Sequence, residues 1–229
     1  MNTIHNRWQD TKPAFYTCLI IIILTLLIST WAWRQIPPDT QLPVHWGING
    51  QPDRYAGKFW GLFMMPVVLT AMGILLILIP LIEPRKKHLN LSMKAYNIIL
   101  IAFFLLMAGL HILIIMSSLN KGISVDRAVP FGVGLLFIVI GNYMGKIRSN
   151  FLLGIKTPWT LTSELSWNKT HRLGGRLFIL CGFFLTLSAF LFTGKVTYAI
   201  LIVGVIGSVI VTFAYSYIVW KNDPQRRIS

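Results

Sequence analysis

Six long apolar segments dominate this sequence and restrict the folds that it can adopt. They cover roughly residues 14–33, 59–82, 95–118, 128–144, 173–192 and 196–220. Most approach the ~20 residues that a helix needs to cross a hydrocarbon core ~30 Å thick. Inside a bilayer the backbone polar groups must be satisfied within the protein, and a helix bonds them within one segment. We therefore expect an all-α, polytopic membrane protein with six transmembrane helices.

The low charge content supports a membrane protein. Charged residues make up 12% of the 229 residues, whereas soluble domains carry roughly 25%. The first apolar segment follows two basic residues, as in a signal peptide, but it exceeds the usual ~7–15 apolar residues and predicts a retained anchor. Cys18 and Cys181 lie inside apolar segments, which predicts buried thiols and gives no metal-binding pattern.

The distribution of basic residues predicts the orientation of the chain. Of the 21 Lys and Arg residues, 15 fall in the tails and loops on the side of the two termini, and 6 fall on the opposite side. Basic loops stay in the cytoplasm, so we expect both termini there, an N-in and C-in arrangement. The net charge of +14 then reflects contact with the anionic lipid bilayer. We expect no direct nucleic-acid binding.

The helices divide the chain into two predicted membrane regions. Residues 1–92 form a two-helix region with a polar external loop over residues 34–58, and residues 93–229 form a four-helix region with a cytoplasmic loop over residues 146–172. Residues 83–94, between the second and third helices, predict a short basic turn at the membrane surface. The sequence leaves the oligomeric state open.

The external loop carries the first group of candidate binding residues. Its four prolines exclude a continuous helix, and residues 42–46 predict a short extended piece before a turn. Aromatic rings and both signs of charge suit recognition of a peptide. Alternatively, Asp53 pairs with Arg54 and Trp46 lies in the membrane interface. The candidate partner-binding residues are His45, Trp46, Asn49, Asp53, Tyr55 and Lys58.

The cytoplasmic loop continues into a predicted helix. Gly154 permits unusual backbone angles, and Pro158 keeps the preceding residue out of a helix. Thr162 or Ser163 can cap the helix that follows, with Glu164 in its first turn. On that helix the spacing predicts Trp167, Thr170 and Gly174 on one face, and Asn168, His171, Arg172 and Gly175 on another. The Gly-Gly pair predicts either a kink or a close helix contact.

Three interpretations of this cytoplasmic stretch remain open: a surface that binds a soluble partner or a lipid headgroup, a segment that orders this face by packing, and an enzymatic site. Glu164 and His171 alone are too few for a catalytic triad, and no nucleophile, phosphate-loop or zinc motif is present. We therefore expect no enzyme, with no catalytic residue, cofactor or metal site. The candidate partner-binding residues are Asn150, Gly154, Lys156, Thr157, Pro158, Trp159, Glu164, Trp167, Thr170, His171 and Arg172.

His111 is the one titratable residue well inside an apolar segment. An ionisable residue at membrane depth is a candidate for function. The alternative is a neutral imidazole that bonds a neighbouring helix.

Two groups of residues carry a resemblance to a known family. The segments Gly141-Asn142-Tyr143, Lys146-Ile147-Arg148, Asn150-Phe151, Gly154–Leu161, Trp167 and Thr170-His171-Arg172 resemble the signature of the SdpI family of bacterial membrane immunity proteins. Lys156 departs from it, because arginine is more usual there. Leu42–Trp46, Gly50, Asp53–Tyr55 and Lys58 resemble an uncharacterised membrane domain that often precedes this signature.

The resemblance implies a multi-pass protein of the bacterial cell membrane that protects against a secreted antimicrobial peptide toxin. In the best-known member it also implies that a small DNA-binding repressor is held at the inner face. We expect the external loop to engage the peptide and the cytoplasmic loop to report that engagement. A rival hypothesis is a transporter or channel for a small solute or lipid, which requires a polar path between the helices.

Overall fold

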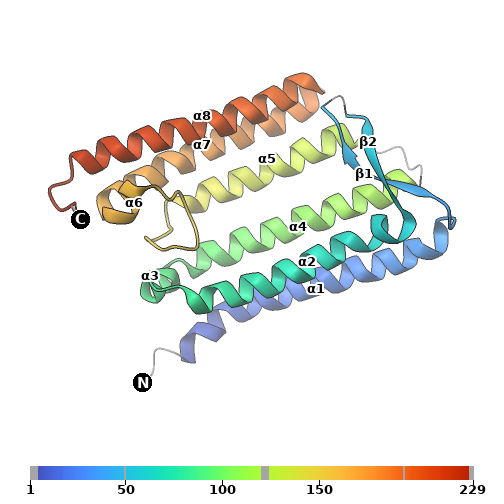
Figure 1. Ribbon diagram of the computed structural model, residues 1–229, viewed down its shortest axis with the longest axis horizontal. Coiled ribbons are helices and arrows are strands. Elements are labelled where there is room, and N and C mark those ends of the chain that lie inside the picture. Colours follow the sequence, from blue (N-terminus) through green and yellow to red (C-terminus); the bar gives the residue numbers. More distant parts are fainter. Residues whose placement is uncertain (1–4, 49, 120–123, 193, 227–229) are drawn as a thin grey trace.

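Six long helices lie side by side in the computed structural model (Figure 1), which describes residues 5–48, 50–119, 124–192 and 194–226. The elements are α1 (His5–Gln35), β1 (Gln41–Trp46), β2 (Pro52–Gly57), α2 (Lys58–Ile82), α3 (Lys86–Leu91), α4 (Met93–Ser118), α5 (Val125–Met144), α6 (Pro158–Thr162), α7 (Glu164–Leu191) and α8 (Lys195–Lys221). In the described ranges, α1, α2, α4, α5, α7 and α8 contain spans long and apolar enough to cross a membrane. The predicted six-helix membrane fold is confirmed.

The helices pack in two groups. Helices α1, α2 and α4 share two buried clusters, one around Leu62 and Ile115 and one around Leu69 and Phe104. Helices α5, α7 and α8 form the second group, and α5 lies beside α4 at the seam between the groups (Figure 1). Helix α4, which the sequence division placed in the second region, contributes to the cores of both groups, because Ala95 and Ile99 pack with Ile147 and Trp167.

Glycines bring α5 and α7 together backbone to backbone. A Cβ atom placed on Gly141 would lie 2.5 Å from the carbonyl oxygen of Gly175, and one on Gly182 would lie 2.5 Å from the carbonyl oxygen of Gly134. No side chain larger than hydrogen fits at these positions, which is typical of close helix packing in membranes. The Gly174-Gly175 pair therefore marks a close contact, and α7 continues through it as one helix.

His111 joins three helices of the first group. Its side chain is fully buried, and Nε2 lies 2.8 Å from Oγ of Ser29 on α1. That hydroxyl lies 2.7 Å from the carbonyl oxygen of Leu62 on α2. This polar bridge between helices supports the helix-linking interpretation of His111, although its other ring nitrogen, Nδ1, is buried without a hydrogen-bond partner among the described residues.

The two ends of the bundle differ in structure. The hairpin end carries an antiparallel hairpin of β1 and β2, and the loop end carries α3, the 146–163 loop, the start of α1 and the end of α8 (Figure 1). The all-α prediction missed the hairpin, although β1 was expected as an extended piece. Residues 52–57 contain no β-branched residue, so β-propensity gave no signal for β2. The predicted basic turn over residues 83–94 also contains the short helix α3.

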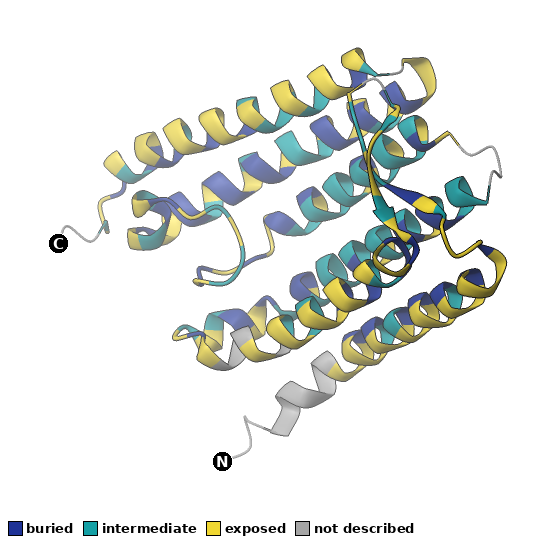
Figure 2. Ribbon diagram, turned by 45° about the vertical axis from the view of Figure 1, so that its right-hand side comes forward, coloured by how far each residue is buried: buried dark blue, intermediate teal, exposed yellow. Residues whose placement is uncertain are grey.

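Large apolar side chains cover the outward faces of the helices. Phe190 is 66% exposed and Val203 is 71% exposed, and the outward faces of the outer helices appear largely in the exposed colour in Figure 2. In water such surfaces would drive association, whereas in a bilayer they contact lipid tails. The protein is therefore a multi-pass protein of the cell membrane.

Candidate functional site

The hairpin end presents part of the first candidate set to solvent. His45 Nδ1 on β1 lies 2.5 Å from Asp53 Oδ1 on β2, and about half of each side chain is exposed. Asp53 therefore pairs across the hairpin with His45, and not with Arg54 as in the local alternative. Tyr55 is 55% exposed. These side chains form an accessible aromatic and charged surface.

Two other residues of this set anchor the hairpin. Trp46 packs partly against the buried cluster around Leu62. Lys58 is largely buried, and its Nζ lies 4.3 Å from the centre of the Trp33 ring, a favourable cation–π contact. Asn49 lies outside the described residues. The structure thus separates exposed candidates from anchoring ones.

The tip of the hairpin reaches the second group of helices. Gly50 has φ +74°, a backbone angle that suits glycine, and a Cβ atom there would lie 2.5 Å from Cβ of Asp126 on α5. At the other end of the hairpin, Leu42 is fully buried and packs against Gly61 of α2. The hairpin therefore spans both helix groups.

At the loop end, Asn150 organises the start of the 146–163 loop. Its side chain is fully buried. Its Oδ1 accepts hydrogen bonds from the N–H groups of Leu152 at 2.8 Å and Leu153 at 2.7 Å, and its Nδ2 donates to the carbonyl of Arg148 at 2.7 Å. Asparagine favours such turns because its amide matches backbone donors and acceptors. This predicted binding residue bonds within the protein.

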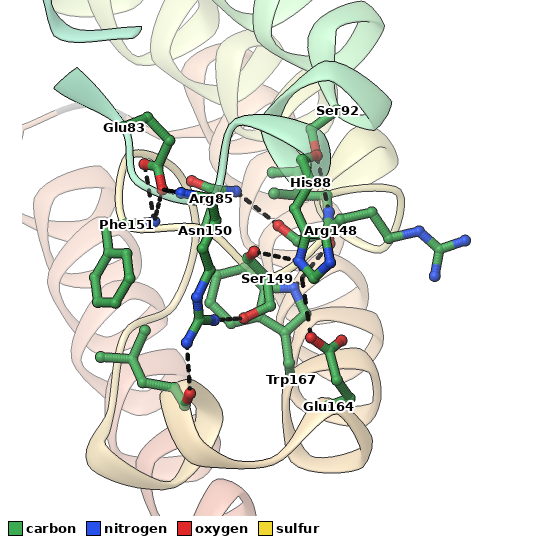
Figure 3. A network of polar contacts seen from close by, with 12 residues as sticks. Glu83, Arg85, His88, Ser92, Arg148, Ser149, Asn150, Phe151, Glu164 and Trp167 are labelled. Atoms are coloured by element: carbon green, nitrogen blue, oxygen red, sulfur yellow. Dashed lines mark hydrogen bonds and ion pairs between the residues drawn. The ribbon is translucent and has the colours of Figure 1, made fainter. Parts of the chain in front are cut away.

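The 83–92 segment holds the same loop from the other helix group (Figure 3). Glu83 is 3% exposed, and its carboxylate accepts the N–H groups of Phe151 and Arg85, each at 3.0 Å. The Arg85 guanidinium donates to Oγ of Ser149 and, at 3.1 Å, to the carbonyl of Leu161. Charge-assisted bonds of this kind are among the strongest in proteins. This contact was not predicted from the sequence, in which the basic segment indicated only an anchor at the membrane surface.

His88 adds a second contact between these segments. Its Nδ1 lies 2.8 Å from the carbonyl oxygen of Ser149 and 3.8 Å from Oε1 of Glu164. Figure 3 shows the side chains of the 83–92 segment directed toward the loop. Glu164 at the start of α7 therefore lies near His88 of the 83–92 segment.

Trp167 and His171 form the centre of the loop end. Both are fully buried, and their rings stack with centroids 4.0 Å apart. Trp167 Nε1 donates to the carbonyl of Ile147 at 2.8 Å. The prediction that these two residues occupy different faces was wrong, because a separation of four residues places side chains on the same side of a helix.

The hydrogen bonds of the two ring nitrogens of His171 define which of them carries a proton. Nε2 accepts the N–H of Ile155 at 2.9 Å, and Nδ1 lies 2.8 Å from the carbonyl oxygen of Trp167. Nε2 therefore has no proton, and Nδ1 carries one, so the ring is neutral. Gly154 has φ +112°, and any Cβ there would collide with the His171 ring. The glycine is required for both backbone angle and space.

Short helix α6 ties the loop to α8. Thr157 caps α6 in a reciprocal pair with Thr160, and its Oγ1 donates to Oγ of Ser216 at 3.0 Å. The Trp159 ring packs 4.9 Å from that of Phe213 on α8. Ser163, one of the two predicted caps, accepts the N–H of Ser166 at the start of α7. These contacts join α6, α7 and α8.

The second candidate set is thus divided in the same way as the first. The side chains inside the packed loop end are Asn150, Thr157, Trp167, Thr170 and His171, and Trp159 is partly buried against α8. The exposed members are Gly154, Lys156, Pro158, Glu164 and Arg172. Among the residues that the structure describes, no group of three His, Cys, Asp or Glu residues could hold a metal ion.

Comparisons with known proteins place both ends in recognised sequence regions. Residues 146–216 match the model of the SdpI/YfhL protein family, and residues 20–70 match a domain of unknown function, DUF1648. The chain is 28% identical over 204 residues to "Immunity protein SdpI" of Bacillus subtilis (strain 168), covering 89% of this chain and 94% of that protein. No solved structure matches the chain. The first match contains most of the loop end and the second contains the hairpin.

Proposed function

We propose that this SdpI-type membrane protein is an immunity protein that protects a cell from a secreted antimicrobial peptide by binding it. The observation that carries the proposal is the similarity to Immunity protein SdpI along 89% of the chain. Similarity of this extent leaves only about a tenth of the chain unmatched. A protective role also agrees with the mixture of exposed aromatic and charged groups on the hairpin.

The hairpin is the proposed binding surface for the peptide. Its strand pairing and buried anchors hold the backbone, so His45, Asp53 and Tyr55 are free to contact a ligand. Tyrosine supplies a large contact area with little loss of conformational entropy. This role requires the hairpin end to face the cell exterior and the loop end to face the cytoplasm.

The exposed part of the loop end is the proposed contact for a cytoplasmic partner. Lys156 and Arg172 offer positive charge, and Glu164 offers negative charge, on a segment whose backbone is held by buried bonds. A small DNA-binding repressor is the partner that the family resemblance implies. Four exposed side chains replace the eleven residues of the sequence prediction as the contact set: Lys156, Pro158, Glu164 and Arg172.

Replacement of SdpI in Bacillus subtilis tests the protective role. The full chain is expressed in cells that lack their own SdpI, and survival is measured after exposure to the peptide against which SdpI protects. We expect survival to recover well above that of cells carrying an empty vector. If cells that carry the protein in their membrane are killed as readily as cells with the empty vector, the immunity proposal for this peptide is removed.

Topology reporters test the proposed orientation separately. One reporter is fused after Ser229, and another is inserted at Asn49, which lies in the sequence between β1 and β2. We expect cytoplasmic activity from the first and external activity from the second. If both reporters lie on the same side, the hairpin and the loop end cannot act on opposite faces of the membrane.

A further inference from the structure

An apolar groove lies at the seam between the two helix groups. It has a volume of about 430 Å³ and is lined by α4 and α5 through apolar residues, with no polar side chain among them. Small residues leave the space open, including Ala102 and Gly109 on α4 and Ala128 on α5. Ordered water needs polar partners, so this lining favours an apolar occupant.

The length of the groove matches one leaflet of a bilayer. Its lining extends over residues 102–113 of α4 and 128–139 of α5, which corresponds to about 17 Å at ~1.5 Å per residue. Half of a ~30 Å hydrocarbon core is about 15 Å. Because α5 begins at Val125 and α4 ends at Ser118, the groove starts close to the hairpin end.

The width of the groove discriminates between two kinds of apolar occupant. A volume of about 430 Å³ spread over about 17 Å gives a cross-section of about 25 Å², a channel ~6 Å wide. An α-helix with its side chains is ~10–12 Å wide. An extended hydrocarbon chain fits inside this cross-section, whereas a second helix could contact only the open side of the groove.

A basic residue adjoins the lining of the groove in sequence at its hairpin-side end. Arg127 is exposed and directly precedes Ala128, the first lining residue of α5. The neighbouring acid, Asp126, packs against Gly50 of the hairpin. We propose that the groove binds one acyl chain of a phospholipid from the hairpin-side leaflet, with the lipid phosphate beside Arg127. This site is independent of the immunity role.

Two glycines provide a matched pair of variants. A Cβ atom on Gly109 would meet no atom within 4 Å, and the same holds for Gly207 on α8. Gly109 lines the groove, whereas Gly207 does not. Gly109→Leu therefore fills the groove without a collision, and Gly207→Leu makes the same chemical change elsewhere. Ala102→Leu is a second variant that narrows the groove at its other end.

The test uses the full chain in phosphatidylglycerol vesicles that contain a trace of phosphatidylglycerol with a photoactivatable group in its acyl chain. After illumination, the labelled peptides are identified by mass spectrometry. We expect the label to concentrate on residues 102–113 and 128–139. Gly109→Leu should lower this labelling about tenfold, equivalent to ~1.4 kcal/mol, Ala102→Leu should lower it as well, and Gly207→Leu should leave it unchanged.

A second probe separates the headgroup from the chain. Arg127→Gln should lower labelling by the phospholipid about fivefold, since a basic residue near the membrane surface contributes ~1 kcal/mol to anionic lipid binding. The same variant should not alter labelling by a diacylglycerol with the same photoactivatable chain and no phosphate.

Three results would overturn the proposal. The first is labelling spread evenly over all lipid-facing helices of the wild-type protein. The second is labelling of the groove that both Gly109→Leu and Ala102→Leu leave intact. The third is a groove labelled by a photoactivatable apolar helical peptide and not by the phospholipid, which would assign it to a helix.

Discussion

The hairpin end and the loop end are both polar interruptions of an apolar chain, but they use their polar side chains differently. At the loop end, Asn150, Glu83 and His171 are buried and bonded to backbone groups. At the hairpin end, Asp53 and Tyr55 are exposed. A polar residue between membrane helices thus serves packing in one place and remains available for recognition in another.

The difference follows from how each end satisfies its backbone. Strand pairing bonds much of the hairpin backbone, so exposed side chains such as Tyr55 are not needed to bond it. The 146–163 loop has little regular structure, so side chains must bond its buried N–H and C=O groups. We therefore expect side chains for recognition where backbone groups bond one another, and packed side chains where backbone groups need side-chain partners.

Removal of the buried tryptophan should have the largest effect on stability. Trp167→Ala leaves a cavity and an unpaired carbonyl at Ile147, and the free energy of unfolding should fall by ~3–5 kcal/mol. Unfolding in mixed micelles, followed by circular dichroism, measures this change. The control is Trp60→Ala near the hairpin end, where the side chain is 59% exposed and the expected change is within ~0.5 kcal/mol. Equal losses for the two variants would contradict the contrast between the ends.

Loss of the Glu83 charge tests the bond between the two segments at the loop end. Glu83→Gln replaces a carboxylate that accepts two backbone N–H groups, and unfolding free energy should fall by ~1.5–3 kcal/mol. Asp53→Asn is the matched change in the exposed pair with His45, where ~0–1 kcal/mol is expected. The same micelle assay compares the two variants. A larger loss of unfolding free energy for Asp53→Asn than for Glu83→Gln would contradict the contrast between the packed loop end and the exposed hairpin end.

Gly154→Ala should lower the free energy of unfolding by ~1–3 kcal/mol, and with it the thermal midpoint, because the residue has a positive φ and alanine is strained there. The new Cβ would also collide with His171. Gly57→Ala, at the end of β2, places its Cβ in open space and should leave the thermal midpoint unchanged or slightly higher. A lower midpoint for Gly57→Ala than for Gly154→Ala would show that the hairpin is the more tightly packed end.

Tyr55→Ala should have the smallest effect on stability, within ~0.5 kcal/mol, because the side chain is 55% exposed. Under the proposed function it should weaken protection at least tenfold, as expected when an aromatic contact worth ~2 kcal/mol is lost. The survival assay in Bacillus subtilis measures this. Lys156→Ala, which alters an exposed side chain at the loop end, should preserve protection. Full protection by Tyr55→Ala would remove this residue from the binding surface.

The sequence predicted the six helices because membrane length and apolar content are local properties. It also contained the cap at Ser163 and the special backbone angle of Gly154, since both depend on residue type and immediate neighbours. From these local features, the place in the sequence of most of the loop end could be predicted.

The partners across space were not predictable in the same way. Glu83 and Phe151 are separated by 68 residues, and no local pattern relates an acid at a helix end to a distant backbone N–H. The one available signal was an acid directly after an apolar span. The spacing of four residues between Trp167 and His171 was a sufficient signal for their stacking, but the sequence prediction placed them on different faces of the helix.

The glycine contact between α5 and α7 has a mechanical consequence. With backbone against backbone at Gly141–Gly175 and Gly134–Gly182, neither helix can slide or roll without steric overlap. The pair is therefore a unit of fixed geometry that connects Asp126 of α5, beside Gly50 of the hairpin, to the stacked rings of Trp167 and His171 at the loop end. The first helix group meets this unit at both ends, through Gly50 at Asp126 and through Glu83 and Arg85 at the 146–163 loop.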